Sequence, residues 1–225
     1  MSLHEYTDLI QGSDEWLAAR RGIVTASVVG QLITPKTIKP ASNDTSRALT
    51  TLLVAERITG WTDPVYVSDD MLRGTMDEPI ARDIYARHFA PVTELGFMVR
   101  DDWGFPIGYS PDGLVGADGL IEVKSRRAKK HVATVLADQV PLENMAQIQA
   151  GLLVSGRQWC DYISYCGGMP MWVKRVHPDP RWADAIVEAV TAFEETAERM
   201  VRDYRAAVTG LPTTERTEHF AEVTF

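Results

Sequence analysis

The sequence predicts an α/β fold in which a central mixed β-sheet of about five strands is flanked by helices. Two observations carry this prediction. Segments with two-residue apolar alternation, such as 120–125 and 159–165, stand between segments with helical apolar spacing, of which 179–208 is the longest. The chain has 225 residues, 45% of them hydrophobic and 24% charged, which is ordinary for a globular domain. We therefore expect a single domain over 1–210 and a polar tail over 211–225.

Short helices are expected near the N-terminus. Ser13 can cap a helix that Gly22 ends, with Trp16 and Leu17 facing the core. A second helix is predicted over 25–32.

The next segments predict a loop followed by two longer helices. Residues 34–45 are rich in Pro, Lys and Ser, which favours a flexible surface loop. Apolar spacing over 46–59 predicts a scaffold helix that Gly60 ends. A further helix is predicted from about Met76, with an apolar stripe of Ile80, Ala81, Ile84, Tyr85 and Phe89.

The central and C-terminal parts are predicted to supply the strands and the last two helices. Turn residues separate the alternating segments, for example Gly and Pro at 167–170. The helices are expected over 141–154 and 179–208. The predicted strands are 91–100, 104–109, 120–125, 159–165 and 171–177.

The stretch 108–130 contains a candidate catalytic trio with the spacing D-x9-E-x-K, formed by Asp112, Glu122 and Lys124. Side chains on a strand alternate between faces, so Glu122 and Lys124 share one face while the apolar residues between and beside them face a core. Turn residues at 116–119 can fold the preceding segment back as a hairpin and bring Asp112 beside Glu122.

Two acids and a lysine in this arrangement suit phosphodiester hydrolysis. The carboxylates of Asp112 and Glu122, together with the backbone carbonyl of Val123, can hold hard cations that generate hydroxide and stabilise the leaving oxygen. Lys124 can orient or deprotonate the attacking water, because nearby cations lower the pKa of an ammonium group. The alternative from spacing alone is a surface hairpin with an ordinary Glu–Lys pair.

The charge distribution restricts how the chain could bind nucleic acid. Its net charge of −8 argues against binding by bulk attraction, so any DNA contact must be local. One basic run follows the candidate trio and is either a phosphate-binding surface or a solvated face. It consists of Lys124, Arg126, Arg127, Lys129 and Lys130.

Cysteine use and hydropathy predict the compartment. Cys160 and Cys166 stand six residues apart in one predicted strand, about 20 Å and beyond disulfide reach, so we expect two buried reduced thiols. No apolar run approaches the roughly 20 residues that cross a bilayer, and residues 1–11 lack the pattern of a signal peptide. We therefore expect a cytoplasmic protein with no membrane contact.

Five segments, taken together, resemble the lambda-exonuclease, YqaJ-like branch of the PD-(D/E)XK nucleases. They are GSDEWLAARRGIVTAS, RGTMDEPIAR, GYSPDGL, LIEVKS and MAQIQAGLLVSG, in the order and spacing of that family. The resemblance implies a restriction-endonuclease-like core and a divalent-metal-dependent exonuclease. Such an enzyme degrades one strand of duplex DNA from its 5′ end and feeds recombination by strand annealing.

The resemblance also implies a pocket for the 5′-terminal phosphate. By motif alignment, Arg20 and Ser27 belong to this pocket, with Arg21 as the alternative arginine, and Ser110 joins them. A further basic residue of the family falls where alignment is uncertain, and Lys130 or Arg127 could take its place. The alternatives from the residues alone are a surface helix cation for Arg20 and a turn residue for Ser110.

Two more residues would join the catalytic trio if the resemblance holds. Glu78 is the glutamate of the family's R-G-x-x-x-E-x-x-A-R segment, although an acid there also suits a helix N-terminus. Gln147 aligns with the active-site glutamine, although a lone glutamine is ordinarily a solvated residue. Asn144 departs from the pattern, because the best-known member has a tyrosine there.

The family implies two Mg²⁺ ions, for which Mn²⁺ can substitute. Asp112 would bridge both ions, Glu122 and the carbonyl of Val123 would hold the one that activates water, and Lys124 would assist that water. Expected partners are double-stranded DNA ends, two further copies in a ring-shaped homotrimer, and a single-strand annealing protein. A phage-encoded protein of this kind would work in the host cytoplasm.

Three other functions remain open from the sequence. The chain could be a PD-(D/E)XK endonuclease or an exonuclease of other polarity, which closed circular duplexes or end-labelled strands would expose. It could be a catalytically silent DNA-end-binding scaffold, although the costly cluster of like charges argues for chemistry. A metal hydrolase of small molecules would leave the basic run unexplained.

Overall fold

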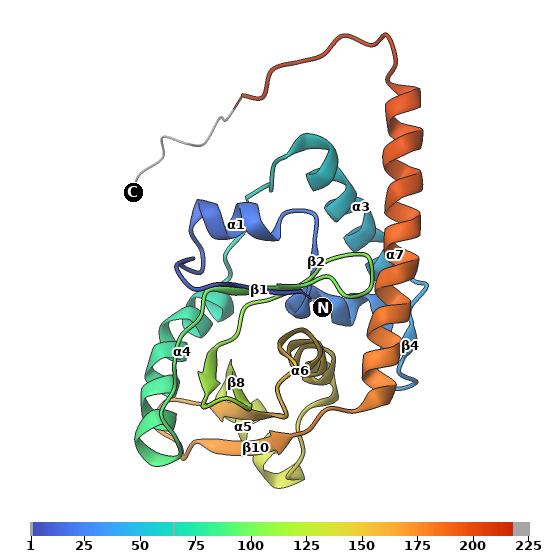
Figure 1. Cartoon of the computed structure of the whole chain (residues 1–225). Coiled ribbons are helices and arrows are strands. Elements are labelled where there is room, and N and C mark those ends of the chain that lie inside the picture. The colour runs from blue at the N-terminus through green and yellow to red at the C-terminus, as the bar shows by residue number, and fades with distance from the viewer. Residues whose placement is uncertain (1, 65, 218–225) are drawn as a thin grey trace.

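The computed structural model describes residues 2–64 and 66–217 (Figure 1). Its α/β class, with mixed strands and flanking helices, confirms the fold class predicted from the sequence. The strands differ in one respect from the prediction of a single sheet of about five. In the described part of the chain they form two sheets of four strands each and one two-stranded hairpin.

The first sheet has the strand order β1-β5-β6-β2. The pairs β1/β5 and β5/β6 are antiparallel, whereas β2 pairs with β6 in parallel, with Val24 opposite Ile107 and Thr25 opposite Gly108. β5 and β6 confirm two predicted strands, shortened at their starts, whereas β1 and β2 were not predicted. The strands are β1 (Leu3–Tyr6), β2 (Val24–Thr25), β5 (Phe97–Arg100) and β6 (Ile107–Tyr109).

The second sheet has the strand order β10-β9-β8-β7 and is mixed. β8 and β9 pair in parallel from Gly119 opposite Trp159 to Ser125 opposite Tyr165, so β8 is an interior strand along its whole length. β7 was not among the predicted strands, but it is the segment that the turn at 116–119 was expected to fold back as a hairpin, and it pairs with β8 in this way. The strands are β7 (Gly113–Val115), β8 (Gly119–Ser125), β9 (Trp159–Tyr165) and β10 (Trp172–Val176).

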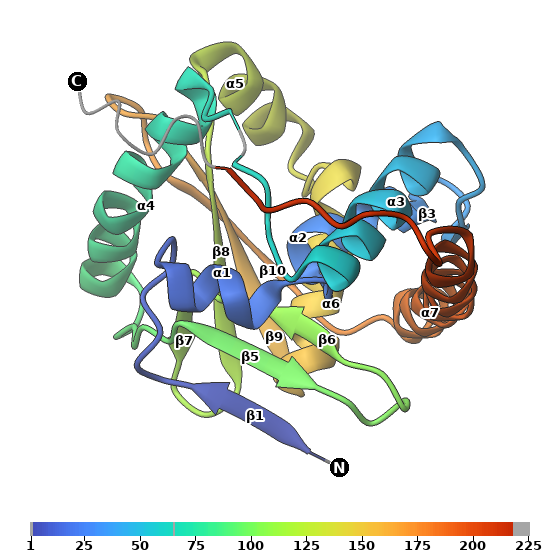
Figure 2. The same cartoon turned by 90° about the horizontal axis from the view of Figure 1, so that it is seen from above.

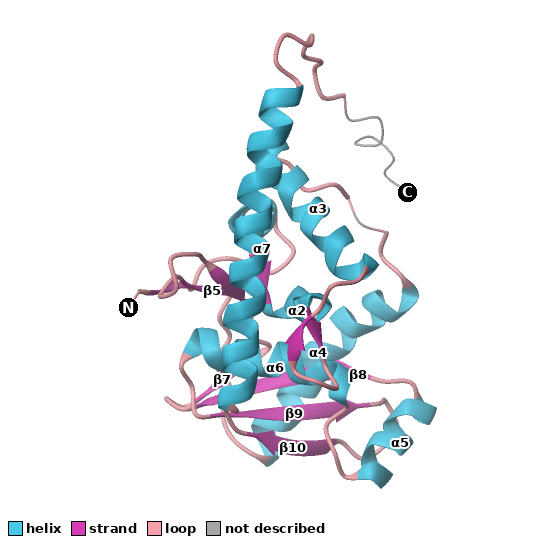
Figure 3. Cartoon of the chain, turned by 90° about the vertical axis from the view of Figure 1, so that its right-hand side faces the viewer, coloured by secondary structure: helices cyan, strands magenta, loops and turns pink. Residues whose placement is uncertain are grey.

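Helices surround and separate the two sheets (Figures 2 and 3). α6 packs against strands of both sheets and against α2 and α7, whereas α4 covers the opposite side of β8 and β9. A 3-10 turn over Gly30–Leu32 extends α2. The helices are α1 (Asp14–Arg20), α2 (Ala26–Val29), α3 (Asp44–Thr59), α4 (Asp69–His88), α5 (Ala128–Ala137), α6 (Leu142–Ser155) and α7 (Pro180–Ala207).

Strand β8 divides its side chains between two hydrophobic cores. Leu120 packs into the larger core with α6 and α7, while Ile121 and Val123 pack into a smaller core with Ala81 and Tyr85 of α4. This is the alternation that the sequence predicts for 120–125. The polar face of β8 therefore lies on the α6 side of the sheet, between buried layers.

Several local predictions need correction. Leu17 is exposed instead of facing the core, and in α4 only Ala81 and Tyr85 of the predicted stripe are buried, with Ile80 and Phe89 exposed. α4 also begins earlier than predicted, because Ser68 caps it by accepting a hydrogen bond from the Met71 amide. Ile80 and Phe89 follow the helical period but face solvent, because α4 contacts the sheet along a narrow strip.

Two segments are more ordered than predicted. The segment 34–45, predicted as a flexible loop, contains the end of one short strand and all of another. These strands, β3 (Ile33–Thr34) and β4 (Lys39–Pro40), form an antiparallel hairpin that packs on α7. α5, which was not predicted, begins within the basic run and contains its last two residues, Lys129 and Lys130. Cys160 is buried as expected, whereas Cys166 is partly exposed, and both are free thiols. Residues 211–217 form neither helix nor strand, and the rest of the predicted tail lies outside the described residues.

No helix in the described ranges combines the length and the apolar character that a bilayer crossing requires.

Candidate active site

The hairpin β7–β8 brings Asp112, Glu122 and Lys124 together as the spacing predicts. Asp112 stands directly before β7, and its Oδ2 accepts a hydrogen bond of 2.6 Å from the backbone N–H of Val123. Within β8 itself, Lys124 Nζ lies 2.6 Å from Glu122 Oε1. We name this group, together with Glu78 and Gln147, the acid centre.

Glu122 is fully buried, with 0% of its surface exposed. Its Oε1 is paired with Lys124, but its Oε2 has no hydrogen-bond partner within the described residues. A buried carboxylate oxygen without a donor is costly, so its presence calls for a ligand that the protein does not itself supply.

Electrostatic repulsion adds to this cost. Burial raises the pKa of Asp112 well above its usual range, and the carboxylates of Glu122 and Glu78 raise it further. Burial alone lowers the pKa of Lys124, but Glu122 and Asp112 outweigh burial and leave that pKa raised. The expected lowering of the lysine pKa thus requires cations that these carboxylates would hold.

Glu78 reaches the acid centre from α4. Arg73 and Asp77 of this helix both hydrogen-bond Ser125 at the end of β8, which fixes α4 against the strand. Burial raises the pKa of Glu78, an effect that Arg82 opposes and that Glu122 reinforces. The glutamate thus lies within electrostatic reach of the trio.

Arg82 ties Glu78 to Asp112, and sequence analysis gave it no role. Its Nη2 lies 2.5 Å from Glu78 Oε1, and its Nε donates to the backbone carbonyl of Asp112 at 2.8 Å. Its third nitrogen, Nη1, pairs with Glu94 at 2.5 Å. The signal was present, because Arg82 follows Glu78 by four residues and therefore shares its helix face.

Gln147 joins the acid centre from α6, where its Oε1 accepts a hydrogen bond of 2.9 Å from Lys124 Nζ. Asn144, one turn earlier, is buried and accepts from Arg126 Nη2 at 2.5 Å. Arg126 also donates to the hydroxyl of Tyr162. Asn144 therefore helps to fasten α6 to the segment that follows β8.

The donor set fits a hard divalent cation. Asp112 and Glu122 offer carboxylate oxygens, one of them buried without a partner, and Val123 lies between them with a backbone carbonyl. Within the described residues no three His, Cys, Asp or Glu side chains converge on one point. The set is therefore two carboxylates and a carbonyl, and water and substrate oxygens would complete the coordination of a bound cation.

A second cluster gathers Arg20, Ser27 and Ser110, which the sequence predicts as a phosphate pocket. Arg20 Nη1 donates to Ser110 Oγ at 2.9 Å, and Arg20 Nη2 donates to Ser27 Oγ at 3.2 Å and to Thr25 Oγ1 at 3.4 Å. The ring of Trp16 lies 4.0 Å from the guanidinium and donates its Nε1–H to Ser110 at 3.0 Å. We name these five residues the arginine pocket.

The hydrogen-bond pattern leaves this pocket able to donate. Ser110 Oγ accepts from both Arg20 and Trp16, so its own O–H remains to donate to an acceptor such as a phosphate oxygen. Burial lowers the pKa of Arg20 to about 10, partly offset by Glu56, and the guanidinium stays charged at neutral pH. Ser27 is exposed, so the pocket opens to solvent.

Arg21 does not join the arginine pocket, since its Nε reaches Thr62 instead, at 3.5 Å. Thr25 and Trp16 were not predicted as members. Trp16 stands four residues before Arg20 on the same helix, which is a readable signal. Thr25 follows from the parallel pairing of β2 with β6, which no local pattern reveals.

Arg127 and Lys130 lie outside both clusters. Arg127 donates to Asp70 at the start of α4, at 2.8 and 3.0 Å, and 71% of its side chain is exposed. Lys130 pairs with Glu143 at 2.7 Å and is about half exposed. The structure thus gives both residues acidic partners, and their predicted contact with phosphate stays a prediction.

Comparison with known proteins shows the family to which this chain belongs. Residues 15–158 match the family model described as the YqaJ-like viral recombinase domain. The chain is 31% identical to an alkaline exonuclease from Laribacter hongkongensis, with a TM-score of 0.79, covering 89% of this chain and 100% of that one. The same exonuclease has also been crystallised in complex with dAMP, with equal similarity.

A more distant structure shares the fold. The phage-related exonuclease from Haemophilus somnus 129PT has 14% identity and a TM-score of 0.63, over 81% of this chain and 96% of that one. Among curated proteins, none matches. The family model and the Laribacter structure together identify this chain as a member of the YqaJ-like viral recombinase family, related to the alkaline exonucleases.

Proposed function

We propose that the chain is a metal-dependent exonuclease that degrades one strand of linear double-stranded DNA in the 5′ to 3′ direction, starting from phosphorylated 5′ ends. One observation carries this proposal. Ser110 of the arginine pocket and Asp112 of the acid centre are separated by Pro111 alone, so their Cα atoms are at most about 7 Å apart. A strand end held in the pocket therefore presents its first phosphodiester bonds to the acid centre.

Divalent cations, Mg²⁺ or Mn²⁺, would be held by Asp112, Glu122 and the Val123 carbonyl, and would supply Lewis acidity and a hydroxide nucleophile. The family resemblance implies two such ions. Lys124, held by Glu122 and Gln147, is placed to orient the attacking water. Glu78 offers a second acceptor for that water, with Arg82 holding its carboxylate.

The arginine pocket supplies the preference for an end. A terminal phosphate carries more negative charge than an internal phosphodiester, and Arg20 offers a guanidinium whose present partners are neutral hydroxyls. Ser27 and Ser110 can turn their O–H groups toward the same phosphate. Arg127 and Lys130 would extend this positive surface once DNA competes with Asp70 and Glu143.

The product of this reaction is a 3′ single strand, which suits recombination by annealing. Binding of dAMP by the Laribacter relative supports a mononucleotide product, because stepwise digestion releases such molecules. The family resemblance implies a homotrimeric ring around the duplex, which would keep a chain with a net charge of −8 on DNA. A single-strand annealing protein is the partner that would receive the product strand.

The test is digestion of linear duplex DNA labelled at either end of one strand and carrying a 5′ phosphate or a 5′ hydroxyl. We expect Mg²⁺-dependent loss of the phosphorylated strand from its 5′ end, and none in EDTA. Loss from the 3′ end would replace the proposal with an exonuclease of other polarity. Cutting of a closed circle would indicate an endonuclease, and end binding without digestion would indicate a silent scaffold.

A further inference from the structure

Gly22 lies two residues after Arg20, at the turn that joins α1 to β2. Its φ of +67° is in the left-handed region, and a Cβ there would lie 2.5 Å from Cγ of Arg57. Both the backbone conformation and the close approach of Arg57 exclude a side chain. The position of this turn therefore depends on contacts to its backbone.

Helix α3 holds the backbone of Gly22 on both sides. The Gly22 N–H donates to Glu56 Oε2 at 2.7 Å, and the Gly22 carbonyl accepts from Arg57 Nε at 2.7 Å. Glu56 is buried, with 8% of its surface exposed, so its hydrogen bond is shielded from water. Two successive residues of one helix thus fix the orientation of one glycine.

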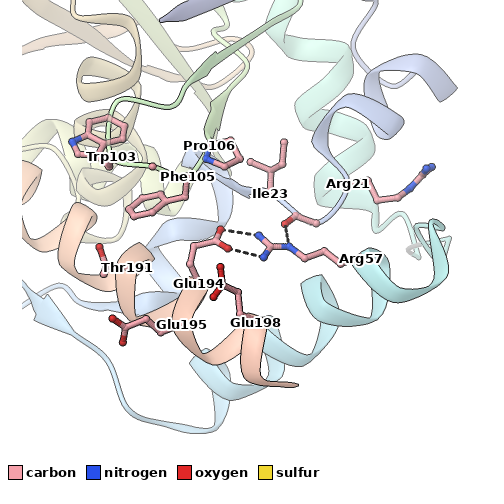
Figure 4. Close-up of a pocket in the computed structure, with 12 residues that line it drawn as sticks. Arg21, Ile23, Arg57, Trp103, Phe105, Pro106, Thr191, Glu194, Glu195 and Glu198 are labelled. Atoms are coloured by element: carbon pink, nitrogen blue, oxygen red, sulfur yellow. Dashed lines mark hydrogen bonds and ion pairs between the residues drawn. The ribbon is translucent and has the colours of Figure 1, made fainter. Parts of the chain in front are cut away.

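Arg57 is itself held by α7. Its two remaining nitrogens pair with the carboxylate of Glu194 at 2.6 and 2.7 Å, and its guanidinium lies 5.1 Å from the ring of Phe193 (Figure 4). A bidentate pair of this kind fixes the plane of the guanidinium as well as its position. We name Glu56, Arg57 and Glu194 the Gly22 clamp.

Apart from the hydrogen bonds of Trp16 and Arg20 in the arginine pocket, helix α1 has little packing to hold it. It is seven residues long and contains no buried residue. Short helices are marginal in water, and their stability comes from packing that α1 lacks. The exit of α1 at Gly22 therefore has a large influence on where Arg20, its last residue, points.

We propose that Glu56, Arg57 and Glu194 are positioning residues that hold Arg20 in the arginine pocket and thereby set the preference for phosphorylated 5′ ends. This inference rests on the proposed function of that pocket. Glu56 also favours the charged form of Arg20, because its negative charge raises the pKa of that guanidinium. The clamp touches neither metal-binding carboxylate, so the chemical step should not depend on it.

The Gly22 clamp can be tested by substitutions that leave the hydrophobic core unchanged. A cavity of about 460 Å³ opens beside the Arg57–Glu194 pair, between α7, α3 and the loop after β5. Substitutions that shorten or neutralise either side chain face this open space. Glu195 lines the same cavity and is exposed, but it is not the partner of Arg57, which makes it a matched control.

The experiment compares Arg57→Lys and Glu194→Gln with Glu195→Gln. A lysine keeps the charge but cannot hold the Gly22 carbonyl and Glu194 together. We expect KM for 5′-phosphorylated duplexes to rise about tenfold in the two clamp variants, with kcat and the KM for hydroxyl ends unchanged. Binding of both duplexes in EDTA, followed by fluorescence anisotropy, should show the same loss without cleavage.

Unchanged discrimination in both clamp variants, or equal losses on both kinds of end, would overturn the proposal. If the parent itself does not distinguish the two ends, the proposed phosphate recognition fails first. Hydrogen exchange over 14–25 then separates the two questions. Faster exchange in Arg57→Lys than in Glu195→Gln would show that the Gly22 clamp holds α1 in place. Equal exchange in the two variants would show that it does not.

Discussion

The acid centre and the arginine pocket are neighbours built in opposite ways. The acid centre lies on β8, an interior strand covered by α4 and α6, and it contains a fully buried carboxylate with an unpartnered oxygen. The arginine pocket lies on short elements, α1, β2 and α2, and each polar side chain in it is paired with another. The acid centre is held rigidly but has an oxygen without a hydrogen-bond partner in the described residues. The arginine pocket has its hydrogen bonds made but rests on short elements.

Under the proposed function, this difference separates the residues for chemistry from the residues for recognition. Repulsion among carboxylates persists only where the surrounding structure holds them together, and a cation relieves it. Recognition of a charged end needs donors that keep their geometry before the ligand arrives, at modest cost to the free protein. The two demands are met by placing one cluster within a sheet and fastening the other by hydrogen bonds.

The strongest test of this division removes the acid centre alone. Asp112→Ala, Glu122→Ala and Lys124→Ala should each reduce the cleavage rate by about 10³-fold or more, because each removes a group at the developing charge. Binding of phosphorylated ends in EDTA should persist. Near-normal cleavage by any of these variants, with an unchanged melting temperature, would sink the assigned roles.

Removing the arginine pocket should have the converse effect. Arg20→Ala should lower kcat/KM for phosphorylated ends by about 10- to 100-fold, the value of one or two charge-assisted hydrogen bonds, and leave hydroxyl ends unchanged. Arg21→Ala is the control, since Arg21 reaches Thr62 instead. Equal behaviour of the two variants would mean that the pocket does not read the phosphate.

Arg82 sharpens the comparison, because it supports the acid centre without belonging to it. Arg82→Gln should weaken Mn²⁺ binding by about tenfold, as outer partners of metal ligands usually do, since it frees Glu78 and the Asp112 carbonyl. Isothermal titration without DNA measures this directly. Arg87→Gln, on the exposed end of the same helix, should leave the affinity unchanged.

Repulsion among the carboxylates of the acid centre should lower the free energy of unfolding of the metal-free chain. The pKa values of Asp112 and Glu78 are raised in the folded state, so their contribution to stability is full below the unfolded pKa of about 4 and is lost as pH rises through the folded values. In EDTA at neutral pH, Asp112→Asn should therefore melt at a higher temperature than the parent.

That difference should shrink toward acid pH and reverse on adding Mg²⁺. Other carboxyls, such as Asp70, have lowered pKa values and contribute the opposite trend, so the quantity to follow is the difference between the two proteins. A difference that does not change with pH would contradict the assigned repulsion.

The smallest effect concerns Arg127 and Lys130. Their ion pairs are exposed, so Arg127→Ala and Lys130→Ala should change the free energy of unfolding by less than about 1 kcal/mol. If each contacts a phosphate, the slope of log affinity against log salt should fall by about one per variant. An unchanged slope would confine phosphate recognition to the arginine pocket.

Sequence patterns predicted the elements that are long enough to show a regular apolar period. α7 and α6 follow from helical spacing, and β8 follows from strict alternation, which also placed Glu122 and Lys124 on one face. β1 and β2 were missed because strands of two to four residues show too little alternation, and the equally short β5 and β6 were found only as parts of longer alternating segments. The division into two sheets escaped because strand partners are chosen by tertiary contacts.

The candidate site was predictable where motifs lie within one element. Arg82 and Trp16 could have been read from their four-residue spacing to Glu78 and Arg20. Thr25 and the Gly22 clamp could not, since they depend on contacts between residues far apart in sequence. Burial of Asn144 and exposure of Leu17 likewise follow from how narrowly each helix meets its neighbours.

The parallel pairing of β2 with β6 has a consequence for the order of folding. The β7–β8 hairpin closes over a short turn, but β2 meets β6 only after the whole chain between them has been brought together. Of the acid centre, only the contact between Asp112 and β8 forms within this hairpin, because Glu78 and Gln147 come from helices far away in the sequence. We therefore expect the hydrogen bond between Asp112 and Val123 to form early in folding and the arginine pocket to form late, an order that hydrogen exchange during refolding over 113–123 and over 24–25 would test.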